Sequence, residues 1–254
     1  MSPTNFSSTF SVSVQSGCVD FGGVKLFEEL DVTLAEGTLT CLLGPSGVGK
    51  STLLRFILGL ETGNANGGTV ACSDGLPLAG RAALMAQRDC LLPWLNVLEN
   101  VTLGSRLRGE AAEIENRRKR ALGLISEVGL SGWETAMPET LSGGMRQRAA
   151  LARTLMEDRP VVLMDEPFSG LDAITKIRLQ SLSARMLKGR TVLLVTHDPL
   201  EALRLGNRII VMAGRPVRLD EPPQLPGEPP RDVDDPAVLE AQGDLLRRLA
   251  EAAS

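Results

Sequence analysis

Cysteine and histidine are scarce in this chain of 254 residues, which has a single histidine and four cysteines with no Cys-x-x-Cys pair. A structural zinc site needs about four such ligands at close spacing, so the pattern argues against one. We therefore expect reduced, buried thiols at all four cysteine positions, which are Cys18, Cys41, Cys72 and Cys90.

Long apolar runs are also missing, because stretches such as Leu53–Leu60 fall far short of the roughly 20 residues that cross a bilayer. The segment Met1–Phe10 has no cationic region followed by an apolar one, so no secretory signal is visible. We expect a cytoplasmic protein without a membrane span.

An excess of positive charge is absent as well, since the formal net charge is −4. Residues 220–254 hold nine acidic and three basic side chains, which leaves the rest of the chain near neutral. A near-neutral body argues against a nucleic-acid partner. The basic run Arg117–Arg120 lies in the stretch Arg106–Val128, which is predicted to belong to an inserted helical subdomain, and it is expected to form a solvated, salt-bridged face.

The C-terminal tail is rich in proline, with six of the 15 prolines between Asp220 and Pro236. Proline breaks regular structure, so an irregular segment is predicted there, followed by a short amphipathic helix over Ala237–Ala252. A solvated cap is the favoured interpretation of this tail, and a partner-binding element is the alternative.

Short, continuously apolar runs dominate the body and are typical of strands buried in a mostly parallel sheet. Polar or small residues follow each run, and ligands of such sheets bind at the carboxyl ends of the strands, so these residues are expected to share one site. The runs are Thr38–Leu43, Ala82–Ala86, Val161–Met164 and Thr191–Val195.

The segment from Gly44 to Thr52 matches the P-loop pattern between a predicted strand and the predicted helix Lys50–Leu60. Backbone N–H groups of such a loop converge on phosphate oxygens, the lysine reaches the β- and γ-phosphates, and the serine hydroxyl binds Mg²⁺. The predicted nucleotide ligands are Gly44, Pro45, Ser46, Gly47, Val48, Gly49, Lys50, Ser51 and Thr52.

Two acidic residues, Asp165 and Glu166, directly follow the run Val161–Met164. Asp165 stands where a carboxylate binds Mg²⁺ in the Walker B arrangement, and Glu166 is positioned to orient the attacking water. A helix-capping role is the alternative for Glu166. His197, which follows Thr191–Val195, is expected to act near the γ-phosphate, with a structural role as its alternative.

A second candidate anion site begins at Leu141-Ser142-Gly143-Gly144-Met145-Arg146-Gln147, where Ser142 can cap a helix and both glycines expose backbone donors. A merely capped helix is the alternative. Taken with the P-loop, Gln87, Val161–Pro167, Ser169–Asp172 and Thr196–Asp198, this segment resembles the ATP-binding-cassette (ABC) ATPases over about residues 10–215.

The resemblance implies an α/β, RecA-like P-loop NTPase core with a mostly parallel sheet, an N-terminal antiparallel β part and an inserted helical subdomain. The implied domains are the first part of the core (1–86), the helical subdomain (87–159), the second part of the core (160–219) and the tail (220–254). In that family two ATPase units dimerise head to tail, and each ATP lies between one P-loop and the partner's signature segment.

Roles carried over by position follow from the same resemblance. Phe21 would stack on adenine, with ordinary core packing as its alternative, and Gln87 would touch Mg²⁺ and link the nucleotide to the helical subdomain. Asp172 would cross the dimer interface. The implied contacts to the partner's nucleotide are Ser142, Gly143, Gly144 and Gln147. One departure from the family pattern is an unusual Gly- and Asn-rich turn at Gly63–Gly68.

The segment Leu91–Val101 resembles importer ATPases of the nitrate, sulfonate and taurine type. Within this branch, the segment Thr154–Leu205 is most similar to ATPases of hydroxymethylpyrimidine or thiamine-precursor import. Leu92 and Trp94 would then face a permease, or else form subdomain core. The implied partners are a second ATPase subunit, integral-membrane permeases and, indirectly, an extracytoplasmic solute-binding protein. The location of the protein that the resemblance implies is the cytoplasmic face of the membrane.

Two other classes remain open at this stage. A soluble ABC-type ATPase of DNA repair or translation would normally carry a coiled-coil insertion or two cassettes, and this chain has neither. A P-loop kinase would need an acceptor site and a lid, and it would not explain Leu141–Gln147. We therefore expect a Mg²⁺- and ATP-dependent ATPase that powers solute import.

Overall fold

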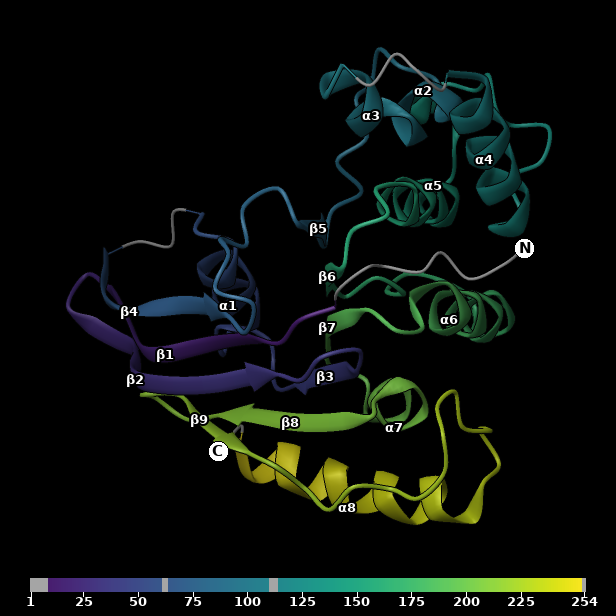
Figure 1. Cartoon of the computed structure of the whole chain (residues 1–254). Coiled ribbons are helices and arrows are strands. Elements are labelled where there is room, and N and C mark those ends of the chain that lie inside the picture. Colours follow the sequence, from purple (N-terminus) through teal and green to yellow (C-terminus); the bar gives the residue numbers. More distant parts are fainter. Residues whose placement is uncertain (1–8, 61–63, 110–113, 253–254) are drawn as a thin grey trace. The chain divides into compact units, whose positions relative to one another are not determined.

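The chain folds into two compact units (Figure 1). The computed structural model describes residues 9–60, 64–109 and 114–252; Met1–Ser8, part of the segment examined for a signal, lies outside them. Unit 1 comprises Met1–Ala82, Pro160–Asp165 and Lys188–Ser254, and unit 2 comprises Ala83–Arg159 and Glu166–Leu187.

A largely parallel sheet forms the centre of unit 1. Its strands run in the order β6-β7-β3-β8-β9, with only β8 and β9 antiparallel. Every residue of β3, β6 and β7 is buried, as their continuously apolar sequences predict. The strands are β3 (Leu39–Leu43), β6 (Val161–Asp165), β7 (Thr191–Thr196), β8 (Arg208–Ala213) and β9 (Arg218–Asp220).

An antiparallel sheet of order β2-β1-β4 completes the β structure of unit 1, in agreement with the predicted fold class. The turn expected at Gly63–Gly68 is wrong for its described part, because β4 begins at Asn64. A Cβ atom at Gly68 would lie 2.6 Å from Gly17 Cα, so glycine there permits close strand pairing. The strands are β1 (Val12–Phe21), β2 (Val24–Leu34) and β4 (Asn64–Cys72).

The apolar core of unit 1 forms where both sheets meet helix α1 (Lys50–Ile57). Leu53 and Leu54 of α1 are buried in the same cluster as Val12 of β1 and Leu42 of β3. Val48 of the loop before α1 belongs to the same cluster, so this packing holds the loop against the sheet.

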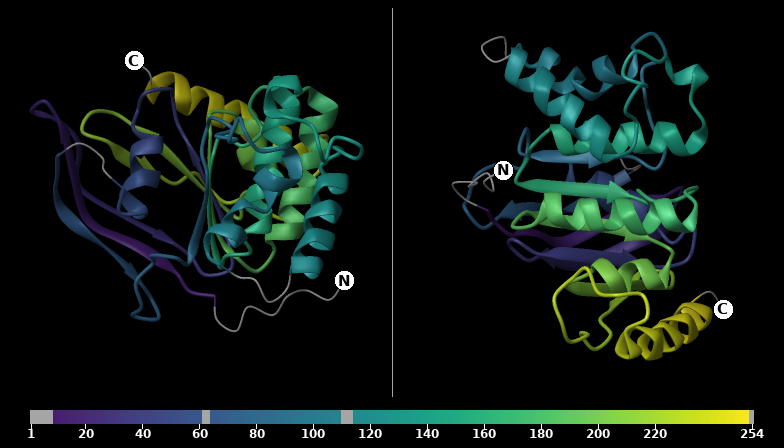
Figure 2. Two further views of the ribbon diagram at one scale, coloured as in Figure 1. Left: turned by 90° about the horizontal axis from the view of Figure 1, so that it is seen from above. Right: turned by 90° about the vertical axis from the view of Figure 1, so that its right-hand side faces the viewer.

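The tail packs on unit 1. Helix α8 (Pro236–Ala252) lies next to α7 (Pro199–Leu205) and β8, as the two turned views also show (Figure 2). Val238 and Leu245 of α8 are almost fully buried, so the tail is more than a solvated cap. Its predicted boundaries are correct to one residue.

Unit 2 is mainly helical and is entered through β5 (Ala82–Met85). The stretch Arg106–Val128, predicted to be part of a helical subdomain, contains the end of α3 at Leu107 and helix α4 from Ile114 onward; residues 110–113 lie outside the described part of the chain. The helices are α2 (Val97–Val101), α3 (Leu103–Leu107), α4 (Ile114–Glu127), α5 (Gly143–Met156) and α6 (Ala173–Leu187), with a 3₁₀ turn at Pro138–Thr140. Buried Val101, Ile125 and Ala149 belong to α2, α4 and α5.

The four cysteines are free thiols, and two of them depart from the prediction. Cys41 and Cys72 are buried, and burial raises the pKa of both thiols. Cys18 is only partly buried and Cys90 is exposed, because Cys90 lies in the loop after β5 with a positive φ of 47° rather than in a strand.

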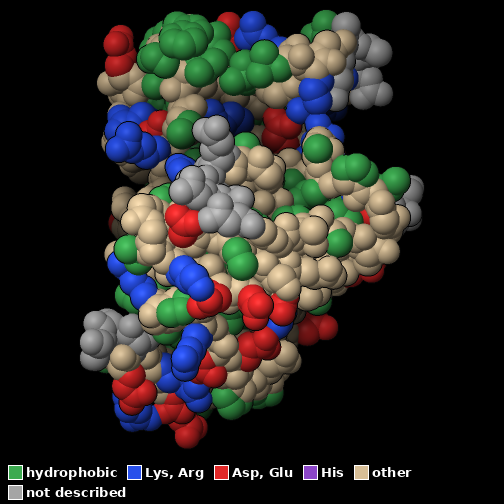
Figure 3. Space-filling model, turned by 90° about the vertical axis from the view of Figure 1, so that its left-hand side faces the viewer, with side chains coloured by type: hydrophobic (Ala, Val, Ile, Leu, Met, Phe, Trp, Pro, Cys, Tyr) green, Lys and Arg blue, Asp and Glu red, His purple; other side chains and the backbone are tan. Residues whose placement is uncertain are grey.

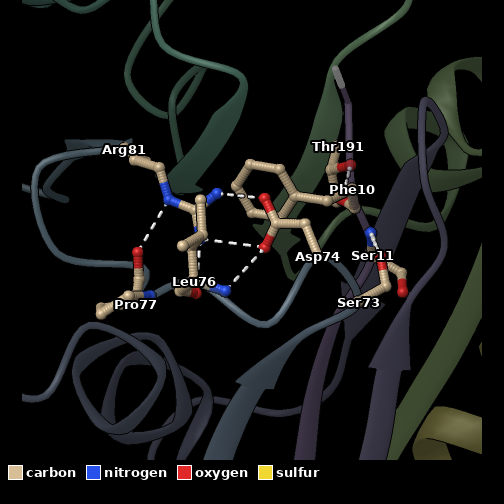
Figure 4. A network of polar contacts seen from close by, with 8 residues as sticks. All are labelled: Phe10, Ser11, Ser73, Asp74, Leu76, Pro77, Arg81 and Thr191. Atoms are coloured by element: carbon tan, nitrogen blue, oxygen red, sulfur yellow. Dashed lines mark hydrogen bonds and ion pairs between the residues drawn. The ribbon is translucent and has the colours of Figure 1, made fainter.

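A polar network ties the loop after β4 to the start of β1 (Figure 4). Arg81 pairs with Asp74 and lies 4.0 Å from the ring centroid of Phe10. Thr191 donates to the Phe10 carbonyl at 2.7 Å, and Ser11 N–H donates to Ser73 Oγ at 3.1 Å. Among the described residues, no helix is long and apolar enough to span a bilayer.

Candidate nucleotide-binding and hydrolysis site

The P-loop of unit 1 has the backbone that a phosphate cradle requires. Gly47 and Gly49 have positive φ angles of 79° and 116°, which side chains other than glycine rarely tolerate. A Cβ atom at Gly44 would lie 2.5 Å from Met212 O, so glycine is also needed where the loop leaves β3. No side chain caps the first turn of α1, and its N–H groups remain available for an anion.

Lys50 is 5% exposed, and its ammonium Nζ donates to Gly44 O at 2.7 Å and Pro45 O at 2.9 Å. A buried ammonium held on loop carbonyls keeps its charge inside the curve of the loop. The hydroxyls of Ser46 and Ser51 belong to exposed residues, and Val48 is buried under the loop. Loop and lysine together fit a triphosphate.

The parallel sheet brings the predicted residues of three strands to one edge. In the register, Leu43 pairs with Thr196, and Asp165 pairs with Val195. Gly44, Asp165 and His197 therefore follow or end neighbouring strands at the same carboxyl edge. Asp165 is 7% exposed, whereas His197 is exposed to solvent.

A cavity of about 330 Å³ adjoins the P-loop within unit 1. Phe21 lines it and is 48% exposed, which excludes the core alternative for this residue. The cavity wall also contains Thr52 of α1 and Arg215, a residue that the sequence pattern did not single out. Arg215 lies 168 positions after Gly47, to which it donates a hydrogen bond, and no local motif marks that pairing.

In unit 2, Gln87 and Glu166 come together although 79 positions separate them. Gln87 Nε2 donates to Glu166 Oε2 over a long 3.5 Å. Glu166 has a positive φ of 48°, a strained backbone for a non-glycine residue. The next helix starts at Ala173, so Glu166 does not occupy the first turn that the capping alternative requires. Strain of this kind collects at functional sites.

Gln147 is 7% exposed, and its amide Nε2 donates to Pro167 O at 3.0 Å and to Glu166 O at 3.5 Å. The sequence predicted a contact between this side chain and a nucleotide. In the structure the amide holds the backbone at Glu166 and Pro167, and the contact with a partner's nucleotide stays a prediction.

The signature segment opens α5 as its sequence predicts. Ser142 Oγ accepts a hydrogen bond from Met145 N–H at 3.2 Å, and Gly143 and Gly144 form the first turn. Asp172 accepts from Thr175 N–H at 3.0 Å at the start of α6, and this bond lowers the pKa of the carboxyl group. Ser142 and Asp172 both belong to exposed surface of unit 2.

A metal ion at the P-loop would depend on the nucleotide. The described residues contain no group of three or more His, Cys, Asp or Glu side chains that could bind a metal alone. Mg²⁺ usually takes one or two protein oxygens with phosphate oxygens and water, and the hydroxyl of Ser51 and the carboxylate of Asp165 are oxygen donors of that kind. The donor set therefore fits Mg²⁺ with a bound nucleotide.

The family model described as "ABC transporter" matches residues 27–169. The chain belongs to the ABC transporter family. Its matched region contains the P-loop, Gln87, the signature segment and the end of β6, so the site residues lie inside the family region, apart from Phe21, Asp172, His197 and Arg215.

Curated relatives indicate which branch of the ABC transporter family this chain resembles. The ABC ATPase is 43% identical over 229 residues to the aliphatic sulfonates import ATP-binding protein SsuB 1 of Rhodococcus jostii (strain RHA1), covering 89% of this chain and 88% of the relative. It is 42% identical to SsuB of Delftia acidovorans, covering 90% of each chain. These relatives establish an ATP-binding subunit of the nitrate, sulfonate and taurine importer type, and they do not favour DNA repair or translation.

Solved structures agree with this assignment. An ATP-binding cassette solved as a dimer in a post-hydrolysis state with ADP and Pi is 32% identical, with a TM-score of 0.69 over 79% of this chain and 93% of that chain. A dimeric bacterial ABC transporter cassette is 30% identical, with a TM-score of 0.70 over the same shares. The ABC ATPase therefore has the P-loop NTPase fold and hydrolyses ATP.

Apolar side chains gather over the part of the ABC ATPase that contains α2 to α4 (Figure 3). Among the exposed large apolar residues are Trp94, Leu107 and Ile114, and Trp94 is 69% exposed. This exposure is inconsistent with the core alternative for Trp94. Leu92 is partly buried, and its N–H donates to Asn100 Oδ1 at 2.8 Å. A permease contact at Trp94 stays a prediction.

Proposed function

We propose that this chain is the ATPase subunit of an organosulfonate importer, working as a dimer on the cytoplasmic side of a membrane permease. The observation that carries the ATPase part is the P-loop with its buried Lys50, whose ammonium lies on the carbonyls of Gly44 and Pro45. The sulfonate part is supported by the SsuB relatives. Nothing in those relatives favours hydroxymethylpyrimidine or a thiamine precursor.

We assign the hydrolytic roles as follows. The P-loop N–H groups and Lys50 bind the β- and γ-phosphates and neutralise charge that develops during in-line attack by water. Glu166 orients or deprotonates that water, and His197 fixes the γ-phosphate. Mg²⁺, when bound by Ser51, Asp165 and the phosphates, supplies further positive charge to the phosphate oxygens. Gln87, whose amide donates to Glu166 Oε2, is assigned a contact with the Mg²⁺ that accompanies the nucleotide.

A second subunit completes the site in this proposal. Gly143, which is exposed, and Gly144, which is partly buried, open the first turn of α5, and the N–H groups of a helix N-terminus favour a phosphate. Since the P-loop already binds one nucleotide, the α5 turn is free to bind the nucleotide of a partner subunit. The dimeric neighbours support this pairing. Closure on ATP and opening after hydrolysis then drive a permease, because the ligand contacts differ between the two states.

The roles of Glu166 and Lys50 can be separated by two variants. Glu166→Gln keeps the size and hydrogen bonding of the side chain but removes the base, so we expect ATP binding and dimer accumulation while turnover falls at least about a hundredfold. Lys50→Ala removes the buried cation and should weaken ATP binding itself. Equilibrium ATP binding, light scattering and phosphate release measure these three properties.

The outcomes distinguish the assignments. Wild-type turnover in the Glu166→Gln variant would show that another group activates the water. Wild-type ATP affinity in the Lys50→Ala variant would remove the phosphate-cradle role. Asp198→Asn serves as the control, because Asp198 caps α7 at the same sheet edge and its replacement preserves a capping side chain.

A further inference from the structure

An arginine from a distant part of the chain lies in the wall of the cavity beside the P-loop. Three segments of unit 1 line this space of about 330 Å³: the β1–β2 turn with Phe21 and Lys25, the P-loop with Gly47, and the β8–β9 turn with Arg215. None of the family motifs includes Arg215. The cavity thus has an aromatic residue on one segment, a phosphate loop on another and a cation on the third.

The β8–β9 turn is held in place beside the P-loop. Val217 N–H donates to Leu26 O of β2 at 2.9 Å, and Val217 is 5% exposed within the core of unit 1. At the other side of the turn, the Met212 carbonyl lies against Gly44, where a Cβ atom would approach to 2.5 Å. Anchors before and after Arg215 therefore fix its backbone next to the cradle.

The two cations that line the cavity differ in their charge environment. Lys25 forms an ion pair with Glu28, and the hydrogen bond from this pair raises the pKa of Lys25. Arg215 has no carboxylate partner among the described residues, and its Nη2 donates to Gly47 O at a long 3.4 Å. A guanidinium offers five N–H donors, so most of its hydrogen-bonding capacity remains for a ligand.

We propose that Arg215 is a nucleotide-binding residue whose guanidinium contacts the ribose-phosphate part of ATP. This inference rests on the proposed ATP site. With the β- and γ-phosphates in the P-loop and the base on Phe21, the ribose and α-phosphate must span the space between them, which is the cavity that Arg215 lines. The contact between the Arg215 guanidinium and the phosphate is electrostatic, because Arg215 adjoins Gly47 of the P-loop.

The test is equilibrium binding of ATP, ADP and GTP to the whole chain in EDTA, by isothermal titration. Arg215→Ala should weaken ATP and ADP alike by about three- to tenfold, the effect of one partly exposed charged contact, and should flatten the salt dependence. Arg215→Lys retains the charge and should bind within about twofold of the wild type. Arg218→Ala is the matched control, because Arg218 is exposed on the same hairpin and does not line the cavity.

Each contrary outcome has a definite meaning. Wild-type affinity in Arg215→Ala, an equal loss in Arg218→Ala, or a change confined to the ATP-to-GTP ratio would overturn the inference and leave the ATP site intact. Failure of the wild-type chain to bind ATP would overturn the proposed function as well. Thermal unfolding without nucleotide checks the fold, and Arg215→Gln repeats the test if the alanine variant is unstable.

Discussion

Single residues set the geometry of the site through their backbone. Gly47 and Gly49 adopt positive φ, and Glu166 does so at 48° without being glycine. Such a conformation costs on the order of 1 kcal/mol or more in a residue that has a Cβ, and surrounding contacts must offset it. At Glu166 those contacts include the bonds from Gln147 to its carbonyl and from Gln87 to its carboxylate.

The Asp74–Arg81 pair predicts a pH effect at this same scale. Hydrogen bonds from Arg81 lower the pKa of Asp74 in the folded chain. A carboxyl group with a lowered folded-state pKa stabilises the fold above its unfolded pKa, and this stabilisation is lost as the pH falls through the folded value. Asp74→Asn should therefore be less stable than the wild type near neutral pH.

The difference in the free energy of unfolding between the wild type and Asp74→Asn should shrink as the pH drops below the ordinary carboxyl range. Urea unfolding between pH 3 and 7 provides the measurement, with Asp220→Asn as the exposed-pair control. A stability gap that stays constant across that range would contradict the electrostatic origin of the effect.

At the scale of elements, one buried arginine joins the tail to unit 1. Arg231 is 7% exposed, and its guanidinium donates to five carbonyls. Leu203 and Gly206 provide two of them at the end of α7, and the proline-rich segment provides the others. A segment with six prolines lacks backbone donors, so a side chain satisfies its carbonyls instead.

Arg231→Met should consequently destabilise the chain by about 2–4 kcal/mol, because several buried carbonyls lose their donor together. We expect α8 of the Arg231→Met variant to become sensitive to limited proteolysis. Arg247→Met is the control, since Arg247 is 74% exposed and its ion pair with Asp244 contributes at most about 1 kcal/mol. Equal protease resistance in both variants would show that α8 docks without Arg231.

At the scale of the whole molecule, function depends on partners. Membership among import ATP-binding subunits implies that this ATPase works with membrane permease chains. The exposed Trp94 in unit 2 is a candidate contact to such a chain. The SsuB relatives are named for the import of aliphatic sulfonates, the cargo that we propose for this chain.

Reconstitution with its permease and solute-binding protein should give ATP-dependent uptake of a radiolabelled alkanesulfonate into liposomes. Nitrate and a thiamine precursor should not compete with this uptake at tenfold excess. Trp94→Ala should reduce uptake while the ATPase rate of the isolated subunit stays at the wild-type level. Uptake of the thiamine precursor in place of the sulfonate would overturn the proposed cargo.

The sequence alone predicted the strands β3, β5, β6 and β7, the P-loop, the cap at Ser142 and the boundaries of α8, because each follows from local patterns of apolar, glycine and capping residues. Only the tertiary structure decided that Gln147 holds the backbone after Glu166 and that Arg215 lines the P-loop cavity. It also decided that β4 pairs with β1 from Asn64 onward. These contacts join residues far apart in the chain, and a local pattern contains no information about which distant partner a side chain will meet.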